Sequence, residues 1–491
     1  MAVAAKGSEE INLPKPRTAT SSSFAEPVVL HGHTATKMIP FRDVCDTIRQ
    51  YAFVASDLPI IVSLEVHTNH EQQQAMVDIM HESFKGFLCD PVDLHRAGQG
   101  LDSVPAELPS PAKLRRKILI KVKYSPPKAN MDEEEPEPTE LESTLTNQSI
   151  TTSLTPSDDE AAKLVKKPNK PSKIIEALSK MGIYTRSCHF KAFTQAEASI
   201  PTHVFSLSER SLLQIHKTDP VGLFTHNKRF FMRAFPKGSR ISSSNLDPAL
   251  YWRLGVQMVA LNWQKLDAGM MLNEAMFANT DGWVLKPAGY RRSSTVRLSG
   301  EFDLSPGNSQ LTIEFFAGQD IPTPKGIDAA KFKPYIKCEL HVESDGNSDG
   351  HAKDGEYKQV TKTFSTCDPD FGRQIVRFDN VPALVPSLSF LRFKVMNDDR
   401  FARDGLAAWA CIRLDRLGHG YRFVHLRDDK GMRSKGVILV RLEYKWNVKA
   451  ISVPIVKDQS AISEPKTSPK KHIVDIEHKL LHGLQNKLNL R

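Results

Sequence analysis

The chain lacks the features that mark several protein classes. None of its six cysteines forms a Cys-x-x-Cys pair, which argues against a zinc site or a disulfide scaffold and favours a reducing compartment. No apolar run approaches 18 residues, so no membrane-spanning helix is expected. The first 24 residues have no apolar core flanked by basic residues, which excludes a secretory signal peptide. No basic stripe interleaved with aromatic residues is present, so a nucleic-acid partner is not expected.

Length and composition instead favour a multidomain protein with well-packed cores. At roughly 150 residues per domain, 491 residues predict about three domains. Apolar residues make up 40% of the chain, which excludes wholesale disorder. Lysine and arginine number 66 against 57 acids, and the net charge of +9 is mild for this length. It is compatible with anionic partners without identifying them.

The N-terminal part has the pattern of alternating strands and helices. Short apolar runs at Val28–Leu30, Pro59–Leu64 and Ile118–Val122 are separated by helical spacing from Phe41 and by a second helix that Asn69 can cap. This alternation predicts a parallel sheet with helices outside.

Changes in composition divide the rest of the chain. Residues 126–172 form a predicted linker, because Met131–Glu142 holds seven acids and no base and a basic, proline-rich run follows. After about residue 292 the pattern becomes all-β, with seven apolar runs between turn clusters, and predicts an eight-stranded sandwich. The predicted organisation is a disordered lead at 1–24, an α/β block at 25–125, the linker, a second α/β block at 173–291, the sandwich at 293–448 and a polar tail at 449–491 with a short helix at 473–488.

Ionisable groups follow the apolar runs of the first α/β block. His31 comes directly after the first run and Glu65 after the second, while Lys121 and Lys123 alternate with apolar residues in the third. In parallel α/β folds the site lies at the carboxyl ends of the strands. A histidine, a carboxylate and two lysines there would suit phosphoryl chemistry with a bound cation. Each residue alone is more often structural: a satisfied loop histidine, a solvated helix cap or lysines that protect a sheet edge.

The second α/β block adds three weaker candidates. Ser206 and Arg233 could contact phosphate, since arginine suits bidentate phosphate binding, and Phe235 could cover a sugar-like ring. Taken alone, an arginine near proline and phenylalanine is usually a packing residue.

The motifs together resemble a known family. Val29–Thr34, Phe41–Val44, Tyr51–Phe53 and Pro59–Glu65 look like the X box of eukaryotic phosphoinositide-specific phospholipase C, in its delta-type and fungal forms. Residues 174–291 look like its Y box, including Arg233–Pro236, Gln257–Trp263 and Gly282–Pro287. Leu311–Pro322 and Gly420–Leu426 are similar to its C2 domain.

The resemblance implies a fold and a reaction. The X and Y boxes would form the halves of a TIM-like barrel, followed by a C2 β-sandwich. The reaction would convert phosphatidylinositol 4,5-bisphosphate into diacylglycerol and inositol 1,4,5-trisphosphate with the help of Ca²⁺. By position, His31 matches a catalytic histidine and Glu65 a calcium ligand. The residues that match substrate contacts are Lys121 and Lys123 for the ring phosphates, Ser206 and Arg233 for the 4-phosphate, and Phe235, where the family usually has a tyrosine stacked on the inositol ring.

The chain also departs from the family pattern. The X box of the family has two further strands upstream, with a second catalytic histidine and three more calcium ligands, and nothing in residues 1–24 resembles them. We therefore expect an N-terminally truncated barrel that lacks its first two strands. One carboxylate cannot hold Ca²⁺, which takes six to eight oxygen ligands. In the C2 domain Asn397 and Asp399 match calcium-loop positions, but Lys333 stands where an aspartate is usual.

These departures leave two functions open. The first is a phosphoinositide phospholipase C, with activity of this chain alone in doubt. The second is a non-catalytic phosphoinositide-binding scaffold. For either function we expect a cytoplasmic monomer that associates peripherally with an anionic membrane.

Overall fold

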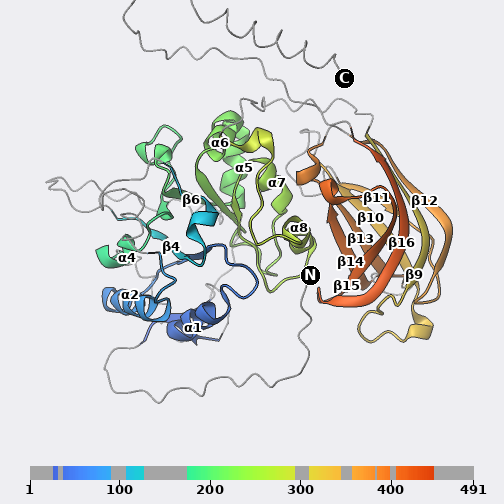
Figure 1. Cartoon of the computed structure of the whole chain (residues 1–491), viewed down its shortest axis with the longest axis horizontal. Helices are drawn as coiled ribbons and strands as arrows, with labels where there is room; N and C mark the ends of the chain where they lie inside the picture. The colour runs from blue at the N-terminus through green and yellow to red at the C-terminus, as the bar shows by residue number, and fades with distance from the viewer. Residues whose placement is uncertain are drawn as a thin grey trace, which may run out of the picture. The chain divides into compact units, whose positions relative to one another are not determined.

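A computed structural model of the chain describes residues 26–30, 37–89, 107–125, 174–292, 309–343, 356–381, 384–398 and 405–446. They form a parallel α/β sheet with its helices and, after it, an antiparallel β-sandwich (Figure 1). The fold class predicted from the sequence is confirmed. Of the described residues, none belongs to a helix long and apolar enough to cross a membrane.

Six parallel strands make up the α/β sheet, in the order β3-β4-β5-β6-β7-β8. Neighbours in the sheet are also neighbours along the chain, as expected where each strand is followed by a crossover on the same side. The strands span Ile60–Ser63, Ile118–Lys123, Arg186–Cys188, His203–Ser208, Phe231–Phe235 and Met258–Val259.

Helices cover the outer face of this sheet. Asn69 caps α2 as predicted, because its Oδ1 accepts a hydrogen bond of 2.8 Å from the backbone N–H of Gln72. Aspartates 219, 247 and 267 cap the later helices α6, α7 and α8 in the same way. The helices are α1 Phe41–Tyr51, α2 His70–Ser83, α4 Glu176–Lys180, α5 Glu209–Thr218, α6 Pro220–Asn227, α7 Pro248–Arg253 and α8 Ala268–Phe277.

The first apolar run was predicted as a strand of the parallel sheet, and this prediction is wrong. Val28–Val29 (β1) pairs antiparallel with Ile39–Pro40 (β2) in a separate two-stranded sheet. It does not join the parallel sheet, because its backbone groups pair with Ile39–Pro40, the segment that leads directly into α1. His31 therefore does not follow a strand of the parallel sheet.

Strand β4 shows how the two faces of the parallel sheet differ. Ile118, Ile120 and Val122 pack on the helix side, in one core with Met80 of α2. Leu119 and Lys121 alternate with them and therefore lie on the opposite, inner face. Leu119 belongs to a small apolar cluster, and Lys121 lies two residues further toward the carboxyl end. The inner face thus changes from apolar to charged along the strand.

The β-sandwich has the predicted eight strands. Their order is β11-β10-β13-β14-β15-β16-β9-β12, and every neighbouring pair is antiparallel. The strands are β9 Ser309–Gln319, β10 Pro334–His341, β11 Glu356–Val360, β12 Asp370–Val381, β13 Phe390–Asn397, β14 Gly405–Arg413, β15 Gly420–Asp428 and β16 Arg433–Lys445. Only β11 was not located from the sequence, because its residues lack an apolar alternation.

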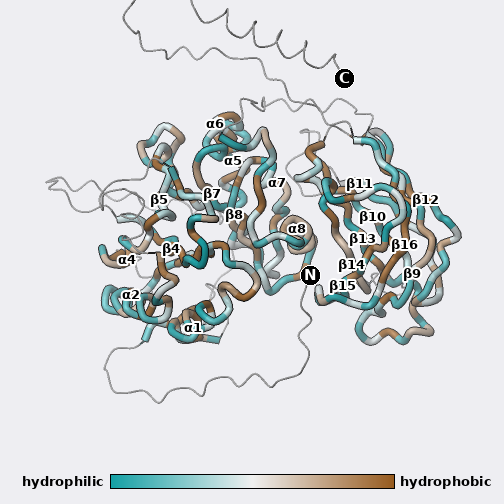
Figure 2. The backbone as a smooth tube through the Cα atoms, viewed as in Figure 1, coloured by the Kyte–Doolittle hydropathy of each residue, from teal (hydrophilic) through white to brown (hydrophobic). Residues whose placement is uncertain are grey.

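Alternating burial builds the core of the sandwich. Along β16, Ile438, Val440 and Leu442 are buried, while the residues between them are more exposed. Figure 2 shows hydrophobic and hydrophilic segments interspersed along the strands of the sandwich. The three buried residues pack with inward residues of the other strands in one large core. Strands β14 and β15 pair through only two residues each, so the sheet folds over there into two layers.

Arginines of the sandwich satisfy the end of helix α8. Arg416 donates through Nη1 to the carbonyl oxygen of Ala278 at 2.6 Å, and Arg413 donates to that of Met276 at 3.4 Å. The last carbonyls of a helix have no partner within the helix and carry partial negative charge, so guanidinium groups stabilise them. The position of α8 is thereby tied to the sandwich.

Candidate functional site

Polar residues of five neighbouring strands lie on the inner face near the carboxyl end of the parallel sheet. The strand register places Ser63 beside Lys121, Lys123 beside Ser187, and Ser206 beside Arg233. Because all these strands run in the same direction, their carboxyl ends share one edge of the sheet. The predicted convergence of phosphate-binding residues on this edge is therefore compatible with the register.

Lys121 is the most deeply buried charge of the site. Lys121 is only 4% exposed, and its Nζ donates a hydrogen bond of 3.2 Å to Ser187 Oγ. Burial and, to a smaller extent, the positive charge of Arg233 together lower the pKa of Lys121 to about 8. An ammonium that is desolvated and repelled by a second cation gains when an anion binds next to it.

Arg233 shares this environment. Met232 and Ala234 are buried in the helix-side core, so Arg233 and Phe235 lie on the inner face. The guanidinium carbon lies 5.3 Å from the centroid of the Phe235 ring, a cation–π distance. Burial lowers the pKa of Arg233, and the negative charge of Glu65 partly opposes that effect.

Ser206 offers an unsatisfied polar atom beside Arg233. Its Oγ is buried and has no hydrogen-bond partner among the described residues. Buried hydroxyls are nearly always hydrogen-bonded in folded proteins, so this hydroxyl is open to a water molecule or to a ligand oxygen. A phosphate oxygen bound by Arg233 could accept this hydrogen bond.

Glu65 follows strand β3 but does not form a metal site. Its side chain is 90% exposed, and Oε1 lies 3.1 Å from Nε2 of His67. Within the described ranges, no three or more His, Cys, Asp or Glu side chains are grouped so that they could hold a metal ion. Since Ca²⁺ requires six to eight oxygens, these residues do not fit a calcium site.

An ion pair fixes the segment that follows β7. Arg240 donates to Glu209 from Nη2 to Oε2 at 2.7 Å, and the backbone N–H of Lys237 donates to Glu209 Oε1 at 3.0 Å. Burial would raise the pKa of Glu209, but the hydrogen bonds of Arg240 and Lys237 outweigh it and lower the pKa. Glu209 thus positions the loop that begins directly after Phe235.

The structure describes two of the remaining predicted site residues, Lys123 and Asn397, and does not describe His31 or Asp399. Lys123 is exposed at the end of β4, next to Ser187 in register. Asn397 is buried, and its Oδ1 accepts a hydrogen bond of 2.9 Å from the backbone N–H of Lys333, so that oxygen serves the structure of the sandwich. His31 and Asp399 lie outside the described residues, and their roles stay predictions.

The sequence did not identify Ser187 as a residue of the site. Its hydroxyl is the hydrogen-bond partner of Lys121, yet it lies in a strand of only three residues, Arg186–Cys188. A strand so short shows no periodicity, so no sequence signal could assign Ser187 to the inner face.

Comparisons with known families agree with this geometry. Residues 15–124 match the family described as "Phosphatidylinositol-specific phospholipase C, X domain", and residues 178–289 match the corresponding Y domain. Residues 309–428 match the C2 domain. Together the matches cover more than half of the chain, in the predicted order.

Curated relatives point the same way. The chain is 32% identical to "1-phosphatidylinositol 4,5-bisphosphate phosphodiesterase 1" of Candida albicans, covering 85% of this chain and 41% of that protein. It is 30% identical to the human "1-phosphatidylinositol 4,5-bisphosphate phosphodiesterase delta-1", covering 83% and 52%. It is 31% identical to the mouse "Inactive phospholipase C-like protein 2", covering 83% and 34%. The chain thus spans about half, or less, of the length of these relatives.

A solved structure supports the fold. The protein in "Crystal Structure of S. officinalis PLC21" superposes with a TM-score of 0.64 over 87% of this chain and 50% of that chain. At 24% sequence identity this likeness shows the arrangement of the elements and nothing more.

Proposed function

Because the chain belongs to the phosphoinositide-specific phospholipase C family, we propose that it carries the substrate site of a phospholipase C for phosphatidylinositol 4,5-bisphosphate, and that turnover needs further groups from outside the described residues. The products of that reaction are diacylglycerol and inositol 1,4,5-trisphosphate. The observation that carries the proposal is a pair of cations, the buried Lys121 and the half-buried Arg233, on one face of the parallel sheet. Neither of them forms an ion pair with any described residue, so their charges are available to an anionic ligand.

The described residues account for recognition of the headgroup. Lys121 and Arg233 bind ring phosphates, and the planar guanidinium can hold two phosphate oxygens at once. Ser206 donates to the phosphate that Arg233 holds. Phe235 packs against the inositol ring and, through its ring face, keeps Arg233 in place. Lys123, being more exposed, contributes mainly charge at the entrance.

Two parts of the reaction lie outside these residues. The charge that develops on phosphorus needs a hydrogen-bond donor, which we assign to His31. Ca²⁺ would neutralise charge on the reacting phosphate when bound. Glu65 alone does not fit a calcium site, because Ca²⁺ takes six to eight oxygen ligands.

A soluble probe tests headgroup recognition. We expect inositol 1,4,5-trisphosphate to bind the full chain in calorimetry, and Arg233→Ala to weaken binding at least tenfold. Lys217→Ala serves as a control because it removes an exposed lysine from the end of α5. Equal affinities for the three proteins would refute the assignment of the site.

Release of inositol trisphosphate from vesicles tests catalysis. Because the described residues do not hold a calcium ligand set, we expect the purified chain to release little product above the blank with or without Ca²⁺. Strong calcium-dependent release would contradict that expectation. Any release that does occur should be lost in His31→Ala; if turnover is unchanged, His31 has no role.

The second candidate is a phosphoinositide-binding scaffold without catalysis. It is favoured by the isolated position of Glu65 and by the likeness to the mouse protein named as inactive. If the chain is a scaffold, it should bind inositol 1,4,5-trisphosphate under all conditions in which it releases no inositol trisphosphate from vesicles. In either function we propose peripheral association with an anionic membrane, where exposed basic residues attract lipid at about 1 kcal/mol each.

A further inference from the structure

Two arginines contact one phenylalanine ring at the amino end of β4. The guanidinium carbon of Arg49, in the last turn of α1, lies 3.9 Å from the centroid of the Phe87 ring. That of Arg116 lies 5.0 Å from the same centroid. The Phe53 ring packs beside Phe87 at a centroid distance of 5.2 Å. Contact with an aromatic face holds a guanidinium group in place and leaves its N–H groups available as hydrogen-bond donors.

The loop that carries Arg116 has an unfavourable backbone conformation. Arg116 has a φ of 56°, in the left-handed region that favours glycine because a Cβ atom crowds the following carbonyl oxygen. Its N–H donates to the carbonyl oxygen of Asp57 at 2.6 Å, and the neighbouring Arg115 pairs with the Asp57 carboxylate. The loop thus places an arginine over the Phe87 ring at a position where glycine fits the backbone better. Residues held in such conformations cluster at functional sites.

Positive charge dominates this end of the strand. Arg49 and Arg116 are both exposed, and within the described ranges neither forms an ion pair. The Asp57 carboxylate is already paired with Arg115, and Lys113 adds a further exposed cation to the same loop. Two guanidinium groups that lack a counterion and are held at one ring can bind phosphate oxygens together, since arginine suits bidentate contacts with phosphate.

This arginine cluster, which consists of Arg49, Arg116 and Phe87, lies far from the headgroup site. It precedes the amino end of β4, whereas Lys123 is the last residue of that strand. At about 3.3 Å per residue, the two ends of β4 are about 17 Å apart. A bilayer that presents a headgroup to Lys121 meets the carboxyl end of the strand. The ligand of the arginine cluster must therefore reach it from solution.

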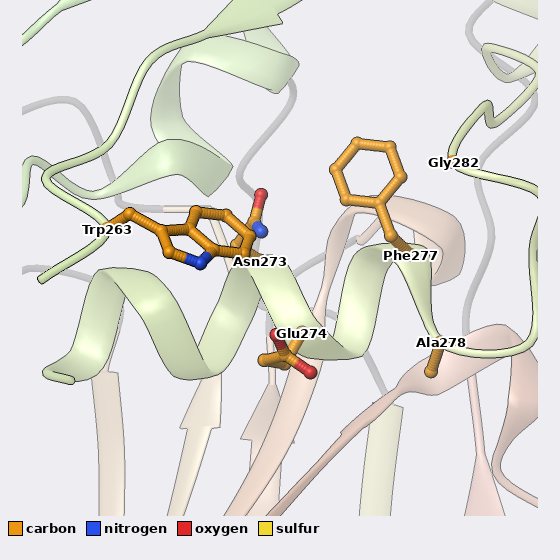
Figure 3. A pocket seen from close by; sticks show the side chains of 6 residues that line it. All are labelled: Trp263, Asn273, Glu274, Phe277, Ala278 and Gly282. Atoms are coloured by element: carbon orange, nitrogen blue, oxygen red, sulfur yellow. The ribbon is translucent and has the colours of Figure 1, made fainter. Parts of the chain in front are cut away.

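A hollow beside α8 is unsuited to the same ligand. It measures about 460 Å³, and Figure 3 shows the Trp263 indole and the Phe277 ring on one side of α8, with Glu274 pointing to the other side. Glu274 is paired there with Arg427 at 3.1 Å. The described residues that line the hollow include no lysine or arginine, so it offers no positive charge to a phosphate group.

We propose that Arg49 and Arg116, both held by Phe87, form a second phosphate-binding site whose ligand is a soluble molecule that carries phosphate groups. The phosphate oxygens accept hydrogen bonds from both guanidinium groups, and the negative charge offsets the repulsion between these two cations. That the ligand is soluble rests on the proposed function, because that function turns the carboxyl edge of the sheet toward the bilayer.

Calorimetry with inorganic pyrophosphate tests the inference. The parent protein is the full chain carrying Arg233→Ala, which removes a cation of the headgroup site and leaves the arginine cluster intact. The measurement is made at about 0.15 M ionic strength, where attraction between distant charges is screened. We expect pyrophosphate to bind the parent protein, and we expect the additional change Arg116→Gly to weaken that binding at least tenfold.

The glycine variant separates binding from folding. Glycine adopts the left-handed conformation of residue 116 without strain, so Arg116→Gly should melt no lower than the parent protein. Arg49→Leu keeps an apolar contact with Phe87 and removes the second guanidinium group, so it should weaken binding at least fivefold. Arg377→Ala is the matched control, because it removes an exposed arginine from β12 of the sandwich and should change the affinity less than twofold.

Vesicles distinguish a soluble ligand from a lipid. Vesicles of phosphatidylcholine and phosphatidylinositol 4,5-bisphosphate should bind the wild-type chain and its Arg116→Gly variant equally, since the bilayer meets the other end of the sheet. Three outcomes would overturn the inference: no binding of pyrophosphate to the parent protein, equal pyrophosphate affinities of the Arg116→Gly and Arg377→Ala variants, and vesicle binding that depends on Arg116.

Failure of the proposed function gives a different result. If Arg233→Ala leaves the inositol trisphosphate affinity of the chain unchanged while pyrophosphate still binds through Arg116, the second phosphate site stands and the proposed headgroup site is wrong.

Discussion

Replacing Lys121 by methionine should stabilise the protein while it weakens headgroup binding. The ammonium is buried on the inner face, and its described hydrogen-bond partner is the Ser187 hydroxyl. A fall in the pKa of Lys121 from 10.5 to about 8 corresponds to a cost of about 3 kcal/mol in the folded state, at about 1.4 kcal/mol for each pH unit. Methionine has a similar shape and no charge, but it forfeits the hydrogen bond, worth about 1 kcal/mol.

The expected net gain for Lys121→Met is therefore about 2 kcal/mol near pH 7. For a domain of this size, that raises the melting temperature by about 4 to 8 °C. Lys123→Met is the control: that lysine is exposed at the end of the same strand, so its replacement should leave the melting temperature unchanged.

The pH dependence gives the sharper test. The cost of Lys121 is fully present below the folded-state pKa of about 8, where the lysine is charged in both the folded and the unfolded states. Between pH 8 and 10.5 only the unfolded state keeps the proton, so the wild-type protein is progressively relieved of the cost. The stability advantage of the variant should therefore disappear between pH 8 and 10.5 in thermal unfolding scans, and near pH 10.5 only the loss of the hydrogen bond remains. A variant that is destabilised near pH 7, or an advantage that persists at pH 10.5, would refute the reasoning.

Four further substitutions probe the site and the sandwich. Arg233→Lys keeps the charge but loses the bidentate geometry, so calorimetry should show at least a fivefold loss of inositol trisphosphate affinity; equal affinity would argue against a paired contact. Phe235→Leu should weaken the same binding about fivefold because the cation–π contact is lost, whereas Phe235→Tyr should retain it. In the sandwich, burial would raise the pKa of Glu339, but the positive charges of Arg392 and Lys394 outweigh burial and lower it to about 2. The ionised Glu339 carboxylate therefore stabilises the folded protein fully above about pH 4.5, and this stabilisation is lost as the pH falls toward 2. Glu339→Gln should cost about 3 kcal/mol at pH 7 in denaturant unfolding and much less near pH 2; a cost independent of pH would contradict this account.

Local patterns were sufficient to identify much of the fold. The alternation along Ile118–Lys123 correctly separated a helix-facing side from an inner side, because side chains of a strand alternate whatever surrounds them. Asn69 was correctly assigned as a helix cap for an equally local reason, a hydrogen bond three residues along the chain. The seven apolar runs of the sandwich were located because each has its own buried face.

Features that depend on residues far apart in the chain could not be predicted from local sequence patterns. The first apolar run formed an antiparallel pair with Ile39–Pro40 instead of joining the parallel sheet, and nothing within the run distinguishes these two partners. Asn397 matched a loop position of the family, yet its Oδ1 accepts the backbone N–H of Lys333, a residue 64 positions earlier.

The amino-acid sequence by itself determined the order of the domains, the two faces of β4 and the residue types available for binding phosphate, because these follow from spacing and chemistry along the chain. Only the tertiary structure decided that Lys121 donates a hydrogen bond to Ser187 Oγ and is repelled by Arg233, and that Glu65 lies on the surface beside His67. Burial and electrostatic interaction are properties of neighbours in space, and strands that are far apart in the chain supply those neighbours.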